Sequence, residues 1–257
     1  MACTSASVYP ARMGKVNVLC IKWGSKYGPD YVNRLRSMVR RNLALPHRFV
    51  CLTDDRVGID ADIETFDIPA VGIPDFDTRA PWAKAHGWLK VTSFAETLYD
   101  LSGPTLFIDL DVVIVGDIGR FFEPPGDFLV IREWDKRDGT GNTSVYRYEI
   151  GAHADLLDRL RENQDEILHE VRNEQEFVTG SLARQGKLGY WPEPWCRSFK
   201  RHCIPAPLGW FGTPRIPPGA AIIAFHGKPD PHDAIAGHSH KWYRRVAPTP
   251  WVAEHWR

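Results

Sequence analysis

The chain has 257 residues, of which 43% are hydrophobic and 25% charged, values that are ordinary for a soluble globular protein. Its 32 Lys and Arg residues balance 32 Asp and Glu residues, and this net charge of zero argues against bulk electrostatic binding of nucleic acid. The sequence has neither the ~18 uninterrupted apolar residues of a transmembrane helix nor the charged start and apolar core of a secretory signal.

Five cysteines show no paired spacing, and Cys20 and Cys51 lie in apolar runs where we expect small core residues. An odd count without a disulfide framework fits a reducing compartment. We therefore expect a cytoplasmic protein.

The N-terminal half of the chain alternates apolar runs with segments of helical spacing. We predict strands over residues 15–22, 48–52 and 63–68, and a helix that opens at Pro29 and is stopped at Pro46. Residues 82–99 show helical spacing, and the apolar run from Thr105 to Val115 predicts a buried strand.

The C-terminal half continues this alternation. Its patterns predict strands over residues 128–131, 144–148 and 220–225, and helices over 155–171 and 174–185. Residues 204–218 hold five prolines and two glycines and must be irregular. The whole chain, 1–257, is therefore expected to be a single α/β domain with a mainly parallel central sheet flanked by helices. We place the catalytic core at about residues 15–230 and an irregular tail at 231–257.

Asp109 and Asp111 interrupt the apolar run between Thr105 and Val115. Burying an unpaired carboxylate is costly, so these side chains need cations, donors or an opening to solvent. Alternation along a strand puts both on one face, ~6–7 Å apart at ~3.3 Å per residue. Such a pair is well placed to hold a divalent metal, and the alternative is a strand end with two exposed acids.

A histidine and a lysine near a later strand end extend this hypothesis. His226 follows the predicted strand 220–225 and precedes Gly227 and Lys228. An imidazole beside carboxylates shifts the metal preference from magnesium toward manganese. Gly227 lets a ligand approach the backbone, and Lys228 can neutralise phosphate. Because ligands of parallel sheets bind beyond the carboxyl ends of the strands, the sequence predicts a site for a metal-bound diphosphate. The alternative for His226 is a satisfied histidine at a strand end.

The residues around the aspartate pair resemble a known family. Trp88-Leu89-Lys90, Leu98-Tyr99-Asp100 and residues 106–123 resemble the central signature of glycogenin-like glycosyltransferases, the family 8 type, whose D-x-D motif corresponds to Asp109-Leu110-Asp111. Three further motifs are similar to its Asn-Ser-Gly-Val turn, its Asp-Gln pair and a shortened form of its terminal His-x-x-Gly-x-x-Lys-Pro-Trp motif. They are Asn142-Thr143-Ser144-Val145, Glu174-Gln175 and His226-Gly227-Lys228-Pro229. The resemblance spans about residues 16–230.

This resemblance implies the GT-A fold and transfer of a hexosyl unit, with retention, from a nucleotide sugar to an acceptor hydroxyl. The expected donor is a UDP-sugar, the expected metal is Mn²⁺ or Mg²⁺, and the acceptor is a glycan, a lipid-linked or a small molecule. The sequence leaves open a front-face mechanism and a double displacement that uses Glu174.

The resemblance also implies a role for each matching residue. Asp109, Asp111 and His226 would bind the metal, with Asp109 also near the nucleotide ribose. Glu174, Gln175 and Lys90 would be the catalytic residues. The donor would be bound by the loop after the first strand, by the sugar pocket and by the residues beside the metal ligands: Ile21, Lys22, Trp23, Tyr27, Lys90, Asp109, Leu110, Asn142, Ser144, Gly227 and Lys228.

Four positions depart from the family pattern. The acid of the Asp-Gln pair is Glu174, one carbon longer, and Ser144 stands where the family has glycine. Asp230-Pro231 replaces Pro-Trp in the final motif, and the first loop carries Lys22-Trp23-Gly24 rather than the usual Thr or Asn pattern. The donor sugar therefore stays open.

Rival functions remain at this point. A phosphatase or phosphotransferase also uses Asp-x-Asp after a buried strand, but there the acids usually lie near the N-terminus and a Gly-Thr turn follows. A non-catalytic carbohydrate-binding protein would explain the tryptophans of the last third: Trp191, Trp195, Trp210, Trp242, Trp251 and Trp256.

Two readings of the histidine-rich C-terminal region are also open. His226, His232, His238 and His240 form a loose alternative set of zinc ligands. The basic aromatic run 240–245 could make weak contact with an acidic lipid surface or an anionic acceptor, although plain solvated charge is the favoured explanation.

Overall fold

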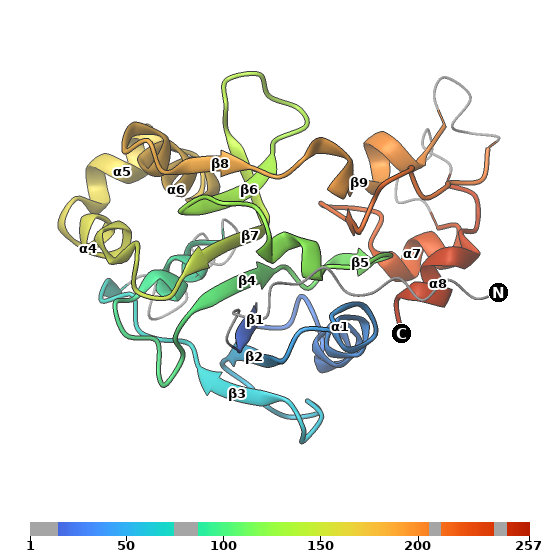
Figure 1. Cartoon of the computed structure of the whole chain (residues 1–257), viewed down its shortest axis with the longest axis horizontal. Coiled ribbons are helices and arrows are strands. Elements are labelled where there is room, and N and C mark those ends of the chain that lie inside the picture. The colour runs from blue at the N-terminus through green and yellow to red at the C-terminus, as the bar shows by residue number, and fades with distance from the viewer. Residues whose placement is uncertain (1–14, 75–86, 206–211, 239–245) are drawn as a thin grey trace.

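The computed structural model describes residues 15–74, 87–205, 212–238 and 246–257 (Figure 1). A seven-stranded sheet in the order β3-β2-β1-β4-β7-β6-β8 forms its centre. Only β7 of this sheet runs antiparallel to its neighbours. The strands are β1 (Val16–Lys22), β2 (His47–Thr53), β3 (Glu64–Asp67), β4 (Pro104–Ile108), β6 (Phe128–Arg132), β7 (Gly141–Glu149) and β8 (Leu188–Tyr190).

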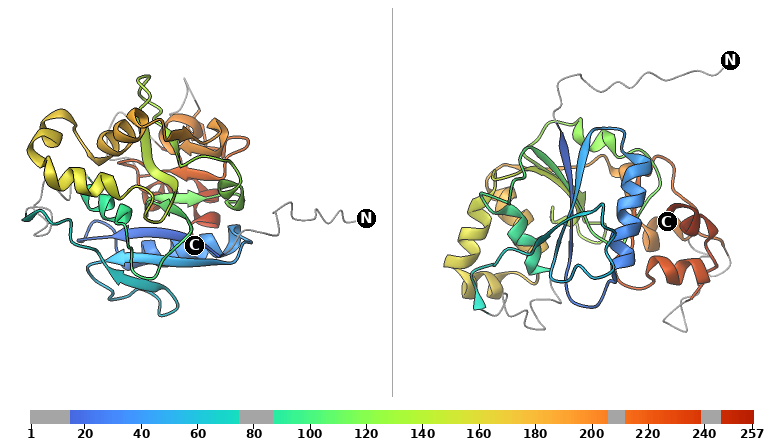
Figure 2. Two further views of the ribbon diagram at one scale, coloured as in Figure 1. Left: turned by 60° about the vertical axis from the view of Figure 1, so that its left-hand side comes forward. Right: turned by 90° about the horizontal axis from the view of Figure 1, so that it is seen from below.

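Helices cover both faces of the sheet, as the view from below shows (Figure 2). On one face, α1 (Pro29–Asn42) packs its apolar side chains Val32, Leu35 and Val39 into a buried cluster. The other face is covered by the 3-10 helix η1 (Trp88–Phe94) and by α4 (Ala154–Glu162), α5 (Gln164–Glu170) and α6 (Glu174–Arg184). The structure is thus a mixed α/β fold with a mainly parallel, helix-flanked sheet, as the sequence predicts.

A second, three-stranded sheet lies beside the first. Its order is β5 (Val112–Ile114), β10 (Ile222–Ala224) and β9 (Cys196–Ser198). Short helical segments connect and cover these strands: η2 (Gly119–Phe122), η3 (Glu193–Trp195), the π-helical turn η4 (Phe199–Cys203), α7 (Pro231–Ala236) and α8 (Pro250–His255). No helix within the described ranges is long and apolar enough to cross a membrane.

The expectation of a single strand through Asp109 and Asp111 is wrong. The run divides into β4 of the large sheet and β5 of the small one, and Asp109-Leu110-Asp111 is the link between them. The Asp109 N–H donates to the Ser144 carbonyl beside β4, whereas the Asp111 carbonyl accepts from the Phe225 N–H beside β5. Asp109 therefore directly follows a strand of the large sheet and Asp111 directly precedes a strand of the small one, so strand alternation does not set their spacing.

Three predicted helical or irregular segments also need correction. Of the helix expected over 82–99, the described part is a 3-10 helix that ends at Phe94, because the hydroxyls of Thr92 and Ser93 bond back to carbonyls three residues earlier. The helix expected over 155–171 breaks at Asn163 into α4 and α5. The tail from residue 231, expected to be irregular, contains α7 and α8.

The tryptophans of the C-terminal third are mainly packing residues. Trp191 and Trp256 are buried, Trp195 packs against Phe121, and Trp251 lies beside Phe199. Trp210 and Trp242, like His240 and the basic run 240–245, lie outside the described residues. Cys20 and Cys51 are buried core residues, as predicted.

Candidate active site

The predicted site residues gather around one cavity of about 630 Å³. It opens where β1 and β4 end and β7 begins, so that side chains from distant parts of the chain meet at one edge of the sheet. Every site residue named from the sequence lines this cavity except Lys228: Ile21, Lys22, Trp23, Tyr27, Lys90, Asp109, Leu110, Asp111, Asn142, Ser144, Glu174, Gln175, His226 and Gly227. Ser25, Lys26, Gly87, Thr143 and Asn173 complete the lining together with Gly24.

Asp109 is paired with a buried lysine. The Lys90 Nζ lies 2.7 Å from one carboxylate oxygen of Asp109 and 2.9 Å from the other. Burial acts to lower the pKa of Lys90, but the carboxylates of Asp109 and Glu174 outweigh it and raise that pKa. Lys90 is therefore a fixed positive charge on the cavity wall.

Among the described residues, no lysine or arginine pairs with Asp111 in this way. The Tyr27 hydroxyl donates to its Oδ2 at 2.6 Å. Burial, followed by repulsion from Asp109, raises the pKa of Asp111 to about 6. Burial and the Asp111 carboxylate also raise the pKa of Tyr27, so Tyr27 stays a donor. Asp111 thus carries negative charge that an added cation would stabilise.

Glu174 is a buried carboxyl at the first position of α6. Thr143 Oγ1 donates to its Oε1 at 2.5 Å. Burial raises the pKa of Glu174 to about 7, although Lys90 and the Thr143 bond act in the opposite direction. Gly87 faces this carboxyl with a φ of +76°, and a Cβ there would stand 3.1 Å from Glu174 Oε2. Close packing of Glu174 therefore depends on glycine at position 87.

The two carboxamides of the predicted sugar pocket are held by protein groups. Asn142 Oδ1 accepts from the Ser144 N–H, and Gln175 Oε1 accepts from the Thr143 N–H. Glu133, which the sequence reading missed, accepts from both amide nitrogens. The sequence motif that contains Thr143 predicts no role for this residue, because its contact with Glu174 depends on how α6 packs against β7.

His226 follows β10 and faces the same cavity from the second sheet. Its Nε2 lies 2.6 Å from Ser198 Oγ, and its ring stacks on Trp134 with centroids 5.4 Å apart. Burial and the neighbouring Lys200 lower its pKa, which favours the neutral imidazole that metals bind.

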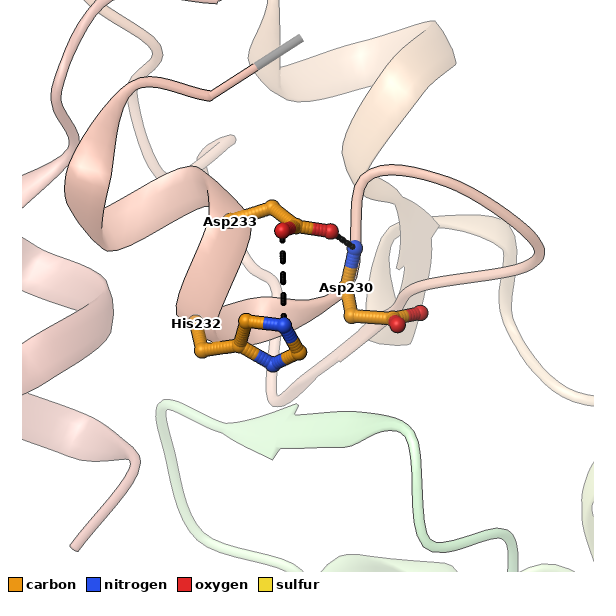
Figure 3. A group of neighbouring side chains, drawn as sticks. All are labelled: Asp230, His232 and Asp233. Atoms are coloured by element: carbon orange, nitrogen blue, oxygen red, sulfur yellow. Dashed lines mark hydrogen bonds and ion pairs between the residues drawn. The ribbon is translucent and has the colours of Figure 1, made fainter. Parts of the chain in front are cut away.

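Lys228 lies outside the cavity lining. Its Nζ pairs with Asp230 at 2.6 Å and with Asp233 at 3.2 Å. Asp230, His232 and Asp233 form a compact group at the start of α7 (Figure 3). Asp230 and Asp233 bond each other's backbone N–H groups in a capping box.

This group is the one set of possible metal ligands that meets within 4.8 Å in the described ranges, so the alternative zinc set of His226, His232 and His238 is not assembled there. The capping bonds and the pairing with Lys228 give its carboxylates structural partners.

The two aspartates of the cavity suit a divalent cation, whereas His226 is not positioned with them as a third ligand. Asp109 and Asp111 offer oxygen ligands to one cavity, and the raised pKa of Asp111 marks negative charge without sufficient compensation. His226 faces that cavity with a nitrogen ligand but is bonded to Ser198, and the three side chains do not form a compact ligand group.

The central sheet, the second sheet and the cavity beside their strand ends match the GT-A fold, in agreement with solved structures. One is the galactosyltransferase LgtC in complex with donor and acceptor sugar analogues, with a TM-score of 0.57 and 14% identity over 84% of this chain and 88% of that chain. Another is an active-site mutant of LgtC, with a TM-score of 0.55 and 12% identity over 93% of this chain and 94% of that chain.

Sequence comparisons give no such relationship. No family model matches the chain, and no curated protein matches its sequence. The likeness to LgtC therefore shows a shared fold.

Proposed function

We propose that the protein is a metal-dependent glycosyltransferase that transfers a hexosyl unit from a nucleotide sugar, a UDP-sugar, to an acceptor hydroxyl with retention. The observation that carries this proposal is the meeting of Asp109, Asp111, Lys90 and Glu174 in one cavity of about 630 Å³. This volume is within the range of small-molecule sites. The GT-A fold supports the assignment, and LgtC provides a galactosyltransferase precedent for it.

In this proposal Asp109 and Asp111 hold a manganese or magnesium ion, with His226 as the third protein ligand. The ion supplies Lewis-acid stabilisation of a departing diphosphate. Lys90 adds a fixed positive charge beside Asp109, which neutralises part of the charge that develops on the leaving group. The loop after β1, with Lys22, Trp23 and Tyr27, binds the nucleotide.

The donor sugar lies against Asn142, Ser144, Glu174 and Gln175 in the same proposal. These side chains offer hydrogen-bonding groups of the kind that match sugar hydroxyls. The charge of Lys90 acts on the buried Glu174 carboxyl, and we assign this carboxyl the position facing the reacting carbon. The acceptor is a glycan, a lipid-linked sugar or a small molecule.

Release of UDP from a panel of nucleotide sugars, with manganese, magnesium or chelator, tests the activity. We expect metal-dependent UDP release from at least one UDP-sugar. Absence of UDP release from every donor would count against the proposal, and phosphate release from a generic phosphoester would instead favour the phosphatase reading.

The variant Asp111→Asn tests the metal site. Asn keeps an acceptor for the Tyr27 hydroxyl but removes the charge that repels Asp109, so the ligand-free melting temperature should stay the same or rise. The increase in melting temperature that UDP and manganese produce together should disappear. Asp158→Asn, a surface change on α4, is the matched control and should keep the full increase. A full increase in Asp111→Asn would refute this role.

A further inference from the structure

Glu133 accepts hydrogen bonds from two residues that line the cavity, Asn142 and Gln175. It follows β6, and its N–H donates to the Thr140 carbonyl, which closes the loop between β6 and β7. Its Oε2 accepts from Asn142 Nδ2 and from Gln175 Nε2, both at 3.1 Å. Its Oε1 accepts from the Trp134 N–H at 2.8 Å. Glu133 does not line the cavity itself.

The two carboxamides have matching environments. Gln175 Oε1 accepts from the Thr143 N–H at 3.2 Å, and Asn142 Oδ1 accepts from the Ser144 N–H at 3.0 Å. Each amide therefore turns its nitrogen to Glu133 and its oxygen to a neighbouring backbone N–H. A flipped amide would set its oxygen against the carboxylate and its NH₂ group against a backbone donor.

A carboxylate is suited to this position because it only accepts hydrogen bonds. Both amides must turn their NH₂ groups toward this carboxylate. The same contact therefore fixes the orientation of both amide groups relative to the cavity. Each amide keeps one N–H and one oxygen lone pair that these contacts do not use. Both side chains line the cavity, so these remaining groups are available to a ligand with hydroxyls.

We propose that Glu133 is a positioning residue that fixes the orientation of the Asn142 and Gln175 carboxamides for recognition of the transferred sugar. This inference rests on the proposed glycosyltransferase function and adds to it a residue that acts through two others. Glu133 sets which amide atoms meet the sugar hydroxyls, whereas the proposed contacts of the nucleotide are Asp109, Asp111 and the loop after β1.

Glu133→Gln tests this separation, because Gln has the same shape but only one acceptor oxygen. Its NH₂ group must face either the two amides or the Trp134 N–H, so the three hydrogen bonds to residue 133 can no longer all form. With the UDP-sugar that the wild type hydrolyses, we expect kcat/KM to fall about tenfold, which corresponds to loss of one or two hydrogen bonds in the transition state. Affinity for UDP with manganese should fall by much less than kcat/KM, because Glu133 acts on the proposed metal ligand His226 through its charge alone. Glu193→Gln, whose carboxylate pairs with Arg197 at the surface, is the matched control and should change neither quantity.

The double variant Glu133→Gln/Gln175→Glu separates positioning from stability. It restores a hydrogen bond between residues 133 and 175 with donor and acceptor exchanged, so the melting temperature should recover toward that of the wild type. The kcat/KM should stay low, because the group presented to the sugar has changed. Recovery of both quantities would show that the contact is only structural and would overturn the inference.

Three other results are decisive. Wild-type kcat/KM in both Glu133→Gln and Glu133→Ala, in an enzyme that releases UDP normally, would overturn the positioning role alone, because the Ala side chain accepts no hydrogen bond from either amide. Equal losses of UDP affinity and of kcat/KM would also overturn it, since they indicate general damage to the site. A wild type that neither binds UDP nor releases it from any donor would overturn the proposed function, and this inference with it.

Discussion

At the scale of single residues, the cavity concentrates acids that the fold does not fully neutralise. Asp109, Asp111 and Glu174 lie around Lys90, and burial raises the pKa of Asp111 to about 6 and of Glu174 to about 7. Such perturbed groups are typical of functional sites because the arrangement that binds or reacts is rarely the most stable one. The cavity residues should therefore make stability depend on pH.

Glu174→Gln should reveal this dependence. The pKa of Glu174 lies near 7 in the fold and near 4.5 in the unfolded chain, so folding favours the protonated form. The stabilisation is present below about pH 4.5 and is lost as the pH rises through about 7. Gln keeps an acceptor for Thr143 and cannot ionise. The stability of the variant relative to the wild type should therefore rise by up to about 3 kcal/mol between about pH 4.5 and pH 8.

Thermal or denaturant unfolding of both proteins in chelator, across this pH range, measures that difference. A difference that does not change with pH would contradict the buried, protonatable state of Glu174.

Sequence reasoning found most of these residues but not their partners. Three sequence motifs each predicted part of the cavity lining. They are Asp109-Leu110-Asp111 and the short motifs that begin at Asn142 and at Glu174. Glu133 carried no such signal, because a lone acid after a strand is common. Its role depends on the packing of β6, β7 and α6, which local spacing does not specify. Lys228 illustrates the opposite case, since nearby Asp230 and Asp233 pair with the lysine that the motif assigned to phosphate.

At the scale of elements, α6 positions the catalytic candidates Glu174 and Gln175 at its first turn. Asn173 precedes the helix, and its side chain accepts from the Glu176 N–H at 3.0 Å. Such a cap satisfies a backbone donor that the helix itself cannot. The geometry of the first turn, and hence of both site residues, depends on this contact.

Asn173→Ala should therefore lower the free energy of unfolding by about 1 kcal/mol. Asn163→Ala is an informative comparison, because Asn163 precedes α5 without making a side-chain cap, and its change should be smaller. Urea unfolding of the two variants measures both values. Equal losses would show that the Asn173 cap contributes nothing specific.

Helices and strands were predicted correctly where the spacing of apolar residues matched the face or faces that the element buries. The prediction failed at two segments that are almost entirely buried. The amphipathic α1 and the apolar β1 follow the sequence pattern closely. All seven residues of η1 are buried, including Lys90, so no polar face marks its extent. The division of β4 from β5 also escaped prediction, because both strands are apolar and only their different partners, β7 and β10, separate them.

At the scale of the whole molecule, aromatic contacts connect the cavity to the C-terminal helices. Tyr27 donates a hydrogen bond to Asp111, and its ring centroid lies 4.8 Å from that of Tyr31. The ring centroids of Tyr31 and Trp256 are 5.1 Å apart. The Tyr31 hydroxyl also contacts His232 of α7. Helix α7 and Trp256 are thus packed against α1 and, through it, support the wall that holds Asp111.

The link Asp109-Leu110-Asp111 has a mechanical consequence, because it joins two sheets with separate hydrogen-bond ladders. Strands β5, β10 and β9 have three residues each, so few backbone hydrogen bonds hold this sheet together. Although the strands are mostly buried, we expect these bonds to open more often than those of the longer central strands. A ligand held by both aspartates would restrain that opening, since the Asp111 carbonyl is bonded to Phe225 directly after β10.

Manganese with UDP should therefore slow amide hydrogen exchange in these three strands, well beyond the residues that touch the ligand. Exchange followed by mass spectrometry should show this protection in the wild type and not in Asp111→Asn. Protection confined to the cavity-lining loops would mean that the two sheets move independently. Protection in all three strands would show that a ligand bound by both aspartates stabilises the hydrogen bonds of the second sheet as well as those at the cavity.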